Sequence, residues 1–128
     1  MRYLLPIDIP ATFRRGKSVE QFLGRCPDDA DYIRYVELRP SESLIEVWVY
    51  DVEDIGTLDE PDLYDLPYLE PDGPDGPVAF FQEPQVAVEY AAAFFRADHL
   101  RWTNLGVGES EYIDYLRAGR PATWPVPA

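Results

Sequence analysis

The chain has 128 residues, the size of one domain, and its 46% hydrophobic content is enough to fill a core. Its net charge of −13 opposes binding to nucleic acid or anionic membranes, and no apolar run of about 18 residues predicts a membrane span. The single cysteine, Cys26, excludes an internal disulfide, and with no signal-like N-terminus we expect a cytoplasmic protein.

The first fifty residues predict an extended arm, a short helix and a hairpin. Residues 4–9 form an apolar stretch that Pro6 interrupts, which is typical of an edge strand or an extended arm. Ser18 is a good N-cap for a short helix over 19–23 that ends at Gly24. Residues 32–38 alternate in polarity and residues 44–50 are β-branched or aromatic, which predicts an antiparallel hairpin with its turn at 40–43.

Regular patterns are lost between residues 51 and 77 and then return. Residues 51–77 form an acidic, proline-rich loop in which only 67–70 could be a short strand. Residues 78–81 have the composition of a buried strand, and Pro84 suits the first turn of a helix over about 84–97. Its predicted apolar face consists of Val86, Ala87, Tyr90, Ala91, Phe94 and Phe95.

The last thirty residues predict a strand, a helix and a tail. We expect a strand at 100–102 and a short helix over 109–118 that buries Tyr112, Ile113 and Leu116. An extended tail covers 119–128. The whole chain therefore predicts one α+β domain, in which an antiparallel sheet of about four to six strands packs against one long and two short helices. Trp48 and Trp102 are expected in the core or on a sheet face.

The charge is distributed very unevenly along the chain. Residues 40–95 contain 14 acidic residues and no lysine or arginine, whereas the other 72 residues sum to +1, from 11 basic and 10 acidic residues. A field of one sign speeds the arrival of an oppositely charged partner, and interleaved tyrosines are common at contact hot spots. The alternative is a solvated loop that serves solubility, although such surfaces usually mix both signs. The candidate partner-binding residues are Asp51, Glu53, Asp54, Asp59, Glu60, Asp62, Tyr64, Asp65, Tyr68, Glu70, Asp72 and Asp75.

The sequence offers little support for catalysis or for a metal or cofactor site. His99 is the single histidine and Cys26 has no nameable partner base, so neither indicates a nucleophile or a zinc site. Residues 51–56 lack the spacing of a calcium loop, and 106–108 lack the basic residue of a phosphate loop. We therefore expect no catalytic residue, no metal and no cofactor, although a pair of carboxylates among the 24 acids stays open.

The order of segments resembles a known family. Ser18 to Pro27 leads into the first strand of the hairpin, and Pro84 to Phe95 leads through a short link into Leu100-Arg101-Trp102. With the stretch from 67 to 73, this is similar to the bacterial immunity proteins that neutralise deaminase-type polymorphic toxins, immunity family one and its relatives. The resemblance covers residues 17–105, while the longer 51–77 region and the tail from 106 depart from the family.

The resemblance implies a protein that is not an enzyme. Such a protein binds a cognate toxin in the cytoplasm and covers the basic cleft of a toxin that acts on nucleic acid. For this chain we expect a monomer or weak homodimer. Two other hypotheses stay open: a small enzyme or ligand-binding domain with an acidic pocket, and a scaffold module. A convergent cluster of buried carboxylates with raised pKa values in a deep cleft would favour the enzyme, whereas a flat or convex acidic face would favour the inhibitor.

Overall fold

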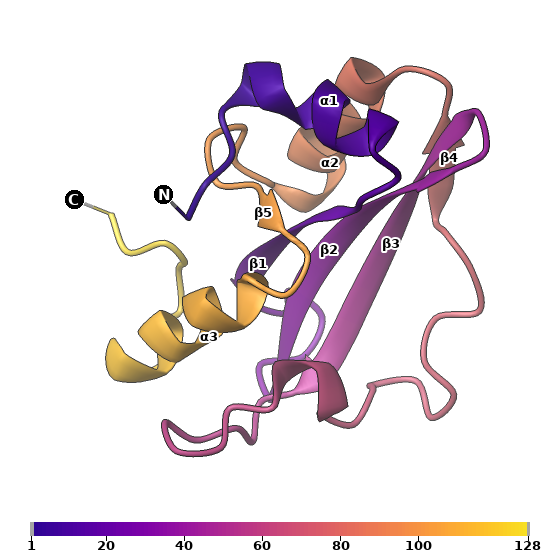
Figure 1. Cartoon of the computed structure of the whole chain (residues 1–128). Coiled ribbons are helices and arrows are strands. Elements are labelled where there is room, and N and C mark those ends of the chain that lie inside the picture. Colours follow the sequence, from indigo (N-terminus) through magenta and orange to yellow (C-terminus); the bar gives the residue numbers. More distant parts are fainter. Residues whose placement is uncertain (1, 128) are drawn as a thin grey trace.

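A computed structural model describes residues 2–127 and shows a five-stranded antiparallel sheet with strand order β4-β3-β2-β1-β5 (Figure 1). The strands are β1 Val19–Arg25, β2 Tyr32–Ser41, β3 Leu44–Glu53, β4 Ala79–Phe81 and β5 Thr103–Asn104. The helical elements are η1 Pro6–Asp8, α1 Ile9–Arg14, η2 Leu63–Asp65, α2 Pro84–Phe95 and α3 Gly108–Arg117. The predicted α+β fold is confirmed. Among the described residues no helix is both long and apolar enough to cross a membrane.

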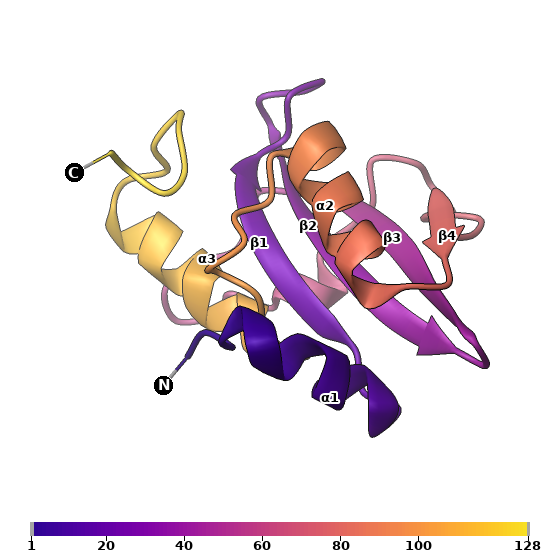
Figure 2. The ribbon, with the colours of Figure 1, turned by 90° about the horizontal axis from the view of Figure 1, so that it is seen from above.

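The sheet is covered on both faces and has a core on each. Figure 2 shows α2 crossing in front of the strands with α1 beside it, while α3 lies to one side next to β1. Alternate residues of a strand point to opposite faces, so each strand supplies both cores. The first core, under α1 and α2, includes Val36, Leu38, Val47, Ala87, Ala91 and Trp102. The second core, on the α3 face, includes Phe22, Ile33, Tyr35, Val52, Leu63, Tyr112 and Tyr115.

The predicted hairpin is confirmed and is the longest pairing in the sheet. β2 and β3 pair from Tyr32 opposite Glu53 to Ser41 opposite Leu44. Glu42 takes the left-handed conformation in the turn, with φ of 55°. Each of the two strands starts where the pattern predicts and runs three residues further at its C-terminal end. Asp51 and Glu53 therefore belong to β3 rather than to the acidic loop.

The predicted helix over residues 19–23 is wrong, because this segment is strand β1. β1 lies between β2 and β5, and both of its faces are covered, so its side chains are buried without alternation. Val19 packs in the first core and Phe22 in the second. Sequence alone cannot separate such a doubly buried strand from a helix segment of the same length. Gly24 marks an irregularity in the pairing and has φ of 86°.

The predicted long helix is confirmed as α2, but its buried face is shifted. The residues that reach the core are Ala87, Val88 and Ala91, whereas Val86 and Phe94 are 40% and 69% exposed. Small side chains let the helix approach the sheet closely, and the larger side chains then lie at the margin. The helix ends at Phe95, because Arg96 adopts the left-handed conformation and closes it.

The N-terminal arm is extended only at its start. Tyr3 forms a bridge with Thr103, and the Leu4 N–H donates to the Trp102 carbonyl at 2.8 Å. From Pro6 the chain forms η1 and then α1, so the predicted edge strand over 4–9 is wrong beyond Leu5. Each of these elements has a proline in its first turn, where the missing N–H is not needed.

The smaller elements confirm the predicted types more often than the predicted bounds. β4 is a strand but not a buried one, since it forms the sheet edge and Phe80 is 62% exposed. The strand predicted at 100–102 begins only at Thr103, after Trp102, which is fully buried in the first core. Residues 67–70, where a short strand was possible, form only a single β-bridge within residues 2–127, between Tyr68 and Val52.

The predicted last helix and tail are both present. α3 buries Tyr112 and Leu116 as predicted, but Tyr115 takes the buried place expected for Ile113. After α3 the tail contains no further helix or strand among the described residues up to 127; residue 128 lies outside them. Trp124 anchors the tail by packing edge-on against Tyr115, with ring centroids 5.7 Å apart.

Candidate functional site

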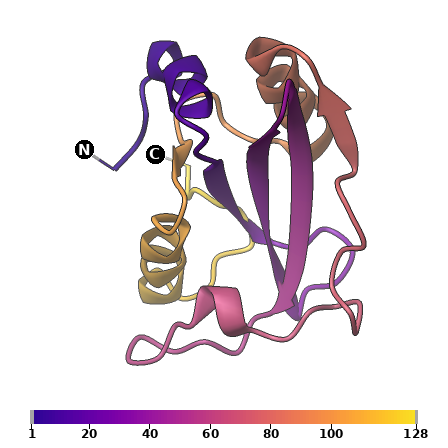
Figure 3. The same ribbon diagram turned by 45° about the vertical axis from the view of Figure 1, so that its right-hand side comes forward.

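The acidic segment closes one end of the sheet. Figure 3 shows the chain leaving β3, running across the lower end of the molecule through η2, and returning to β4. Leu63 and Leu66 are buried in the second core and anchor this course. On the return, the Glu53 N–H donates to the Pro67 carbonyl at 2.8 Å, and the Leu69 N–H donates to the Asp51 carbonyl at 2.9 Å. The segment is therefore a defined surface held to the end of β3.

Two of the predicted contact acids are used inside the fold. Asp51 accepts hydrogen bonds from Nε and Nη2 of Arg34 at 2.7 and 3.0 Å, the two-point geometry that strengthens such pairs. Asp54 accepts a hydrogen bond from the Tyr112 hydroxyl at 2.7 Å and pairs with Arg120 at 3.1 Å. Because these carboxylates already have partners, we assign them to holding the segment rather than to meeting another protein.

The remaining acids of the segment are free. Glu53 is half-buried on β3. Seven others are exposed, and none of them forms an ion pair within residues 2–127: Asp59, Glu60, Asp62, Asp65, Glu70, Asp72 and Asp75.

The turn between β1 and β2 adds acids that the sequence reasoning missed. The Asp54 N–H donates to the Asp31 carbonyl at 3.0 Å, so this turn lies directly against the acidic segment. Asp28 is 77% exposed although it lies 3.4 Å from Arg34. The aspartates at 28–31 are visible in the sequence as a possible extension of the acidic surface. The predicted helix over 19–23, however, gives no reason to place this turn beside the acidic segment. We call the segment 54–77 together with the turn 27–31 the acidic end.

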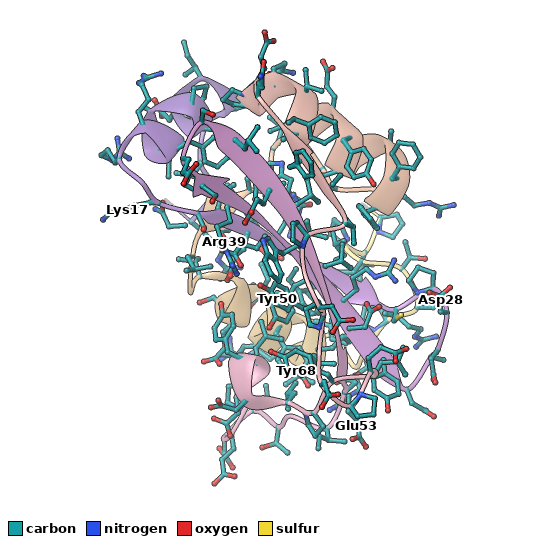
Figure 4. All side chains as sticks on the ribbon, turned by 90° about the vertical axis from the view of Figure 1, so that its right-hand side faces the viewer. Lys17, Asp28, Arg39, Tyr50, Glu53 and Tyr68 are labelled. Atoms are coloured by element: carbon teal, nitrogen blue, oxygen red, sulfur yellow. The ribbon has the colours of Figure 1, made fainter. Side chains whose placement is uncertain are left out.

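The two tyrosines of the segment attach it to the sheet. Tyr64 is 39% exposed, and its ring meets Tyr35 edge-on at 5.8 Å while its hydroxyl donates to Glu20. Tyr68 is half-buried with its ring 6.4 Å from Tyr50. Figure 4 shows Arg39, Tyr50 and Tyr68 following one another along the face of the sheet, toward the acidic end. Both tyrosines therefore serve the fold, and only Tyr64 offers much area to a partner.

Glu20 ties the acidic segment to the start of α3. Its side chain is 1% exposed, and Oε2 accepts the N–H of Gly106 at 3.1 Å and of Gly108 at 2.8 Å in addition to the Tyr64 hydroxyl. The other oxygen, Oε1, has no hydrogen-bond partner. Burial raises the pKa of the Glu20 carboxyl, and the neighbouring charge of Glu37 raises it further.

Glu37 lies opposite Glu20 across β1 and β2 but is fully paired. It accepts hydrogen bonds from Ser18 at 2.6 Å, from Arg39 at 3.0 and 3.1 Å, and from the Tyr50 hydroxyl at 2.9 Å. Burial opposes its ionisation, but the hydrogen bonds, first that of Arg39, outweigh burial and lower the pKa of the Glu37 carboxyl. Arg39 also lies over the Trp48 ring, 4.1 Å from its centroid.

These buried carboxylates do not form an open acidic pocket. Glu20 and Glu37 are 1% and 6% exposed, so a substrate has no access to them. The cleft nearest the acidic end, of about 330 Å³, is instead lined by Asp28, Asp51, Glu70 and Arg34 among others, and Arg34 already binds two of these acids.

The structure brings no metal-binding set together. No group of three or more His, Cys, Asp or Glu residues within 2–127 has an arrangement that could hold a metal ion. His99 is exposed, and Cys26 is buried, which raises the pKa of its thiol.

Comparison with known proteins assigns no family. No family model matches the sequence, and no curated protein or solved structure matches it either. The helix predicted at residues 19–23, within the segment that carries the resemblance to immunity proteins, is strand β1. Function is therefore argued below from the charge, exposure and contacts of the acidic end.

Proposed function

We propose that the chain is an immunity protein that binds a cognate toxin and covers the toxin's basic, nucleic-acid-binding cleft with the acidic end. The observation that carries the proposal is the set of seven exposed, unpaired acids of the segment, which the turn at 28–31 extends. Arg34 and Arg120 contact this end, and carboxylates of the fold already neutralise both of them. A partner that carries phosphate-binding arginines and lysines would be attracted by this concentration of negative charge as it is by its substrate.

Exposed apolar side chains among these acids support a contact surface over a purely solubilising one. Ile55 is 55% exposed and Leu58 is 54% exposed, both in the loop between β3 and η2, with Tyr64 close behind in sequence. Exposed apolar side chains do not increase solubility, whereas interfaces between proteins bury an apolar centre inside a charged rim. Charges of the rim set the association rate, and the apolar centre sets the dissociation rate.

A rescue experiment tests the biological role. The proposal predicts that a secreted protein with a basic C-terminal domain is encoded next to this chain, and this domain is to be expressed in a sensitive host with and without the chain. We expect growth only when both are present, and a stable complex when the two purified proteins are mixed. Absence of such a neighbouring domain, or toxicity that the chain leaves unchanged, would contradict the proposal.

Charge reversal tests whether the acidic end makes the contact. Replacing Glu60, Asp65 and Glu70 together by lysine should slow association by about tenfold and flatten its dependence on salt. The control replaces Glu42, Glu83 and Glu89 by lysine, since these exposed acids lie outside the acidic end and give the same change in net charge. Equal slowing in both triple variants would show that only the net charge matters.

A second pair of variants tests the apolar centre. Ile55→Ala with Leu58→Ala should raise the dissociation rate by about tenfold or more and leave the association rate nearly unchanged. The control is Leu5→Ala with Ile7→Ala, two exposed side chains of the N-terminal arm outside the acidic end, at 53% and 83% exposure. Surface plasmon resonance separates the two rates. An unchanged dissociation rate would remove Ile55 and Leu58 from the interface.

A further inference from the structure

A second surface feature borders the turn 27–31 of the acidic end: a cleft of about 640 Å³ at the end of β1. β5 pairs only with Val19 and Glu20, so the rest of β1 has no strand partner on that side among the described residues. The C-terminal end of α2 forms one wall and the tail around Trp124 forms another. Figure 2 shows these two segments on either side of β1. The volume lies within the range of small-molecule sites.

The cleft is lined by four arginines and one acid, Asp98, in a chain with a net charge of −13. Arg34 and Arg101 are paired with carboxylates of the fold, at 2.7 Å from Asp51 and 2.7 Å from Glu111 respectively. The other two arginines, Arg25 and Arg96, form no ion pair within residues 2–127.

These two unpaired arginines have local contacts that leave their charge available. Arg25 donates one hydrogen bond to the Arg120 carbonyl at 3.1 Å, which uses one of its five N–H donors. Arg96 is exposed, and its backbone closes α2 through an N–H bond to the Ala91 carbonyl. With 24 acids in the chain, two arginines without a carboxylate partner in one cleft indicate a place for an external anion.

The same cleft has an aromatic wall. Phe94, Phe95 and Trp124 line it, and Phe94 is 69% exposed although it lies on a helix that packs against the sheet. Phe95 is fixed by Arg34, whose guanidinium lies 5.7 Å from the ring centroid. Trp124 is fixed by its indole N–H, which donates to Glu111 at 3.2 Å. Rigid aromatic side chains next to guanidinium groups can hold a flat apolar group and its negative charge together.

We propose that this cleft binds a small organic anion, which sets its negative group against Arg25 and Arg96 and its apolar body against Phe94, Phe95 and Trp124. The carbonyl end of α2 opposes an anion with a partial charge of about −0.5. Arg96 at the cap of that helix offsets this effect, and Asp98 is the single full negative charge on the wall. The balance in the cleft therefore favours an anion. Anion binding in the cleft does not require toxin binding by the acidic end, although the turn 27–31 borders both surfaces.

Titration of the isotope-labelled protein with phenyl phosphate, followed by NMR at constant ionic strength, tests the proposal. We expect saturable shifts at Gly24, Arg25 and Trp124 in the millimolar range or tighter. Inorganic phosphate has the negative group without the aromatic ring, and benzyl alcohol has the ring without the negative group, so both should bind more weakly. Arg25→Gln with Arg96→Gln should weaken phenyl phosphate binding by about tenfold or more. Phe94→Ala, at an exposed position, should weaken it without affecting folding.

The matched control is Arg14→Gln with Arg15→Gln, which removes the same charge from two exposed arginines at the end of α1, outside the cleft. This variant should bind as the unmodified chain does. Absence of saturable shifts with phenyl phosphate would overturn the proposal, as would equal weakening in the two arginine pairs. Inorganic phosphate binding as tightly as phenyl phosphate would overturn the assignment of the aromatic wall.

Discussion

Two glutamates opposite each other in β1 and β2 show how surroundings decide the state of a side chain. Glu20 and Glu37 are cross-strand neighbours, and both are almost fully buried. Glu37 receives the guanidinium of Arg39, and its pKa is lowered. Glu20 receives neutral donors alone, keeps one oxygen without a partner, and its pKa is raised. The pair therefore predicts opposite effects on stability when the charge is removed.

Glu20→Gln is expected to stabilise the protein at neutral and alkaline pH. A raised pKa means that the folded state holds the proton more tightly than the unfolded chain, so stability falls as pH rises through the Glu20 pKa. Removing the charge should raise the free energy of unfolding at about pH 8 by on the order of 1 kcal/mol. Urea unfolding measures this. A gain that does not shrink toward about pH 3, where the carboxyl is protonated in both states, would contradict the account.

Glu37→Gln should do the reverse. A lowered pKa contributes stability above the unfolded value, and this contribution is lost as pH falls through the folded value. The variant leaves Arg39 without its anion, and we expect a loss of about 1–3 kcal/mol at neutral pH that becomes smaller on acidification. The same urea series checks it. If both glutamine variants moved stability in the same direction, the difference in pairing would not explain the two pKa shifts.

At the scale of the element, the polarity pattern of the sequence predicts a strand or helix correctly where only one of its faces is buried. The β2–β3 hairpin and α2 were found because alternation and helical spacing are local signals. The prediction of a helix in place of β1 is wrong because a strand that is buried on both faces shows no alternation of polar and apolar residues. The predicted face of α2 includes the buried Ala87 and Ala91 but omits Val88, and it wrongly includes Val86 and Phe94, which are exposed. Both errors concern packing partners that lie far away in the sequence.

The candidate site likewise has residues that the sequence alone identifies and residues whose role depends on distant partners. The free acids of residues 59–75 could be listed from composition alone. The structural use of Asp51 and Asp54 depends on Arg34 and Arg120, and no local pattern links these residues. The turn at 28–31 joins the acidic end only because β1 is a strand that ends there. The arginine cleft assembles β1, α2 and the tail, so nothing in the sequence predicts it.

Gly24 tests how β1 and the tail fit together. Its φ of 86° is unfavourable for other residues, and an added Cβ would lie 2.6 Å from the Trp124 Cβ. Gly16→Ala is the matched control, because Gly16 has φ of 75° but nothing within 4 Å of an added Cβ. We expect Gly24→Ala to cost at least about 1 kcal/mol more than Gly16→Ala in urea unfolding, and to shift one indole N–H resonance. Equal costs would show that the contact with Trp124 contributes nothing.

At the scale of the whole molecule, the chain separates its charges. Figure 4 shows Glu53 at the end of β3, next to the acidic end, with Lys17 toward the other end of the molecule. Arg14 and Arg15 are exposed at the end of α1, close to Lys17 in sequence. Concentrating acids at one end strengthens the field that a basic partner meets, and the same acids repel one another in the free protein. Function and stability therefore make opposite demands on this surface.

Neutralising part of the acidic end should stabilise the free protein. Asp59→Asn, Glu60→Gln and Asp62→Asn remove three charges that have no ion pair, and Asn tolerates the left-handed conformation of Asp62, with φ of 46°. At low ionic strength we expect the melting temperature to rise by roughly 2–5 °C, and by much less above about 0.5 M salt, where screening removes the repulsion.

Glu42→Gln, Glu83→Gln and Glu89→Gln give the same net charge by changes scattered over the rest of the surface. They should raise the melting temperature less, because each of these acids lies in a weaker negative field than the acids of the segment. Equal gains from the two triple variants would place the repulsion in the net charge of the chain. A larger gain at the acidic end, lost in high salt, would place it in the surface that we propose as the toxin contact.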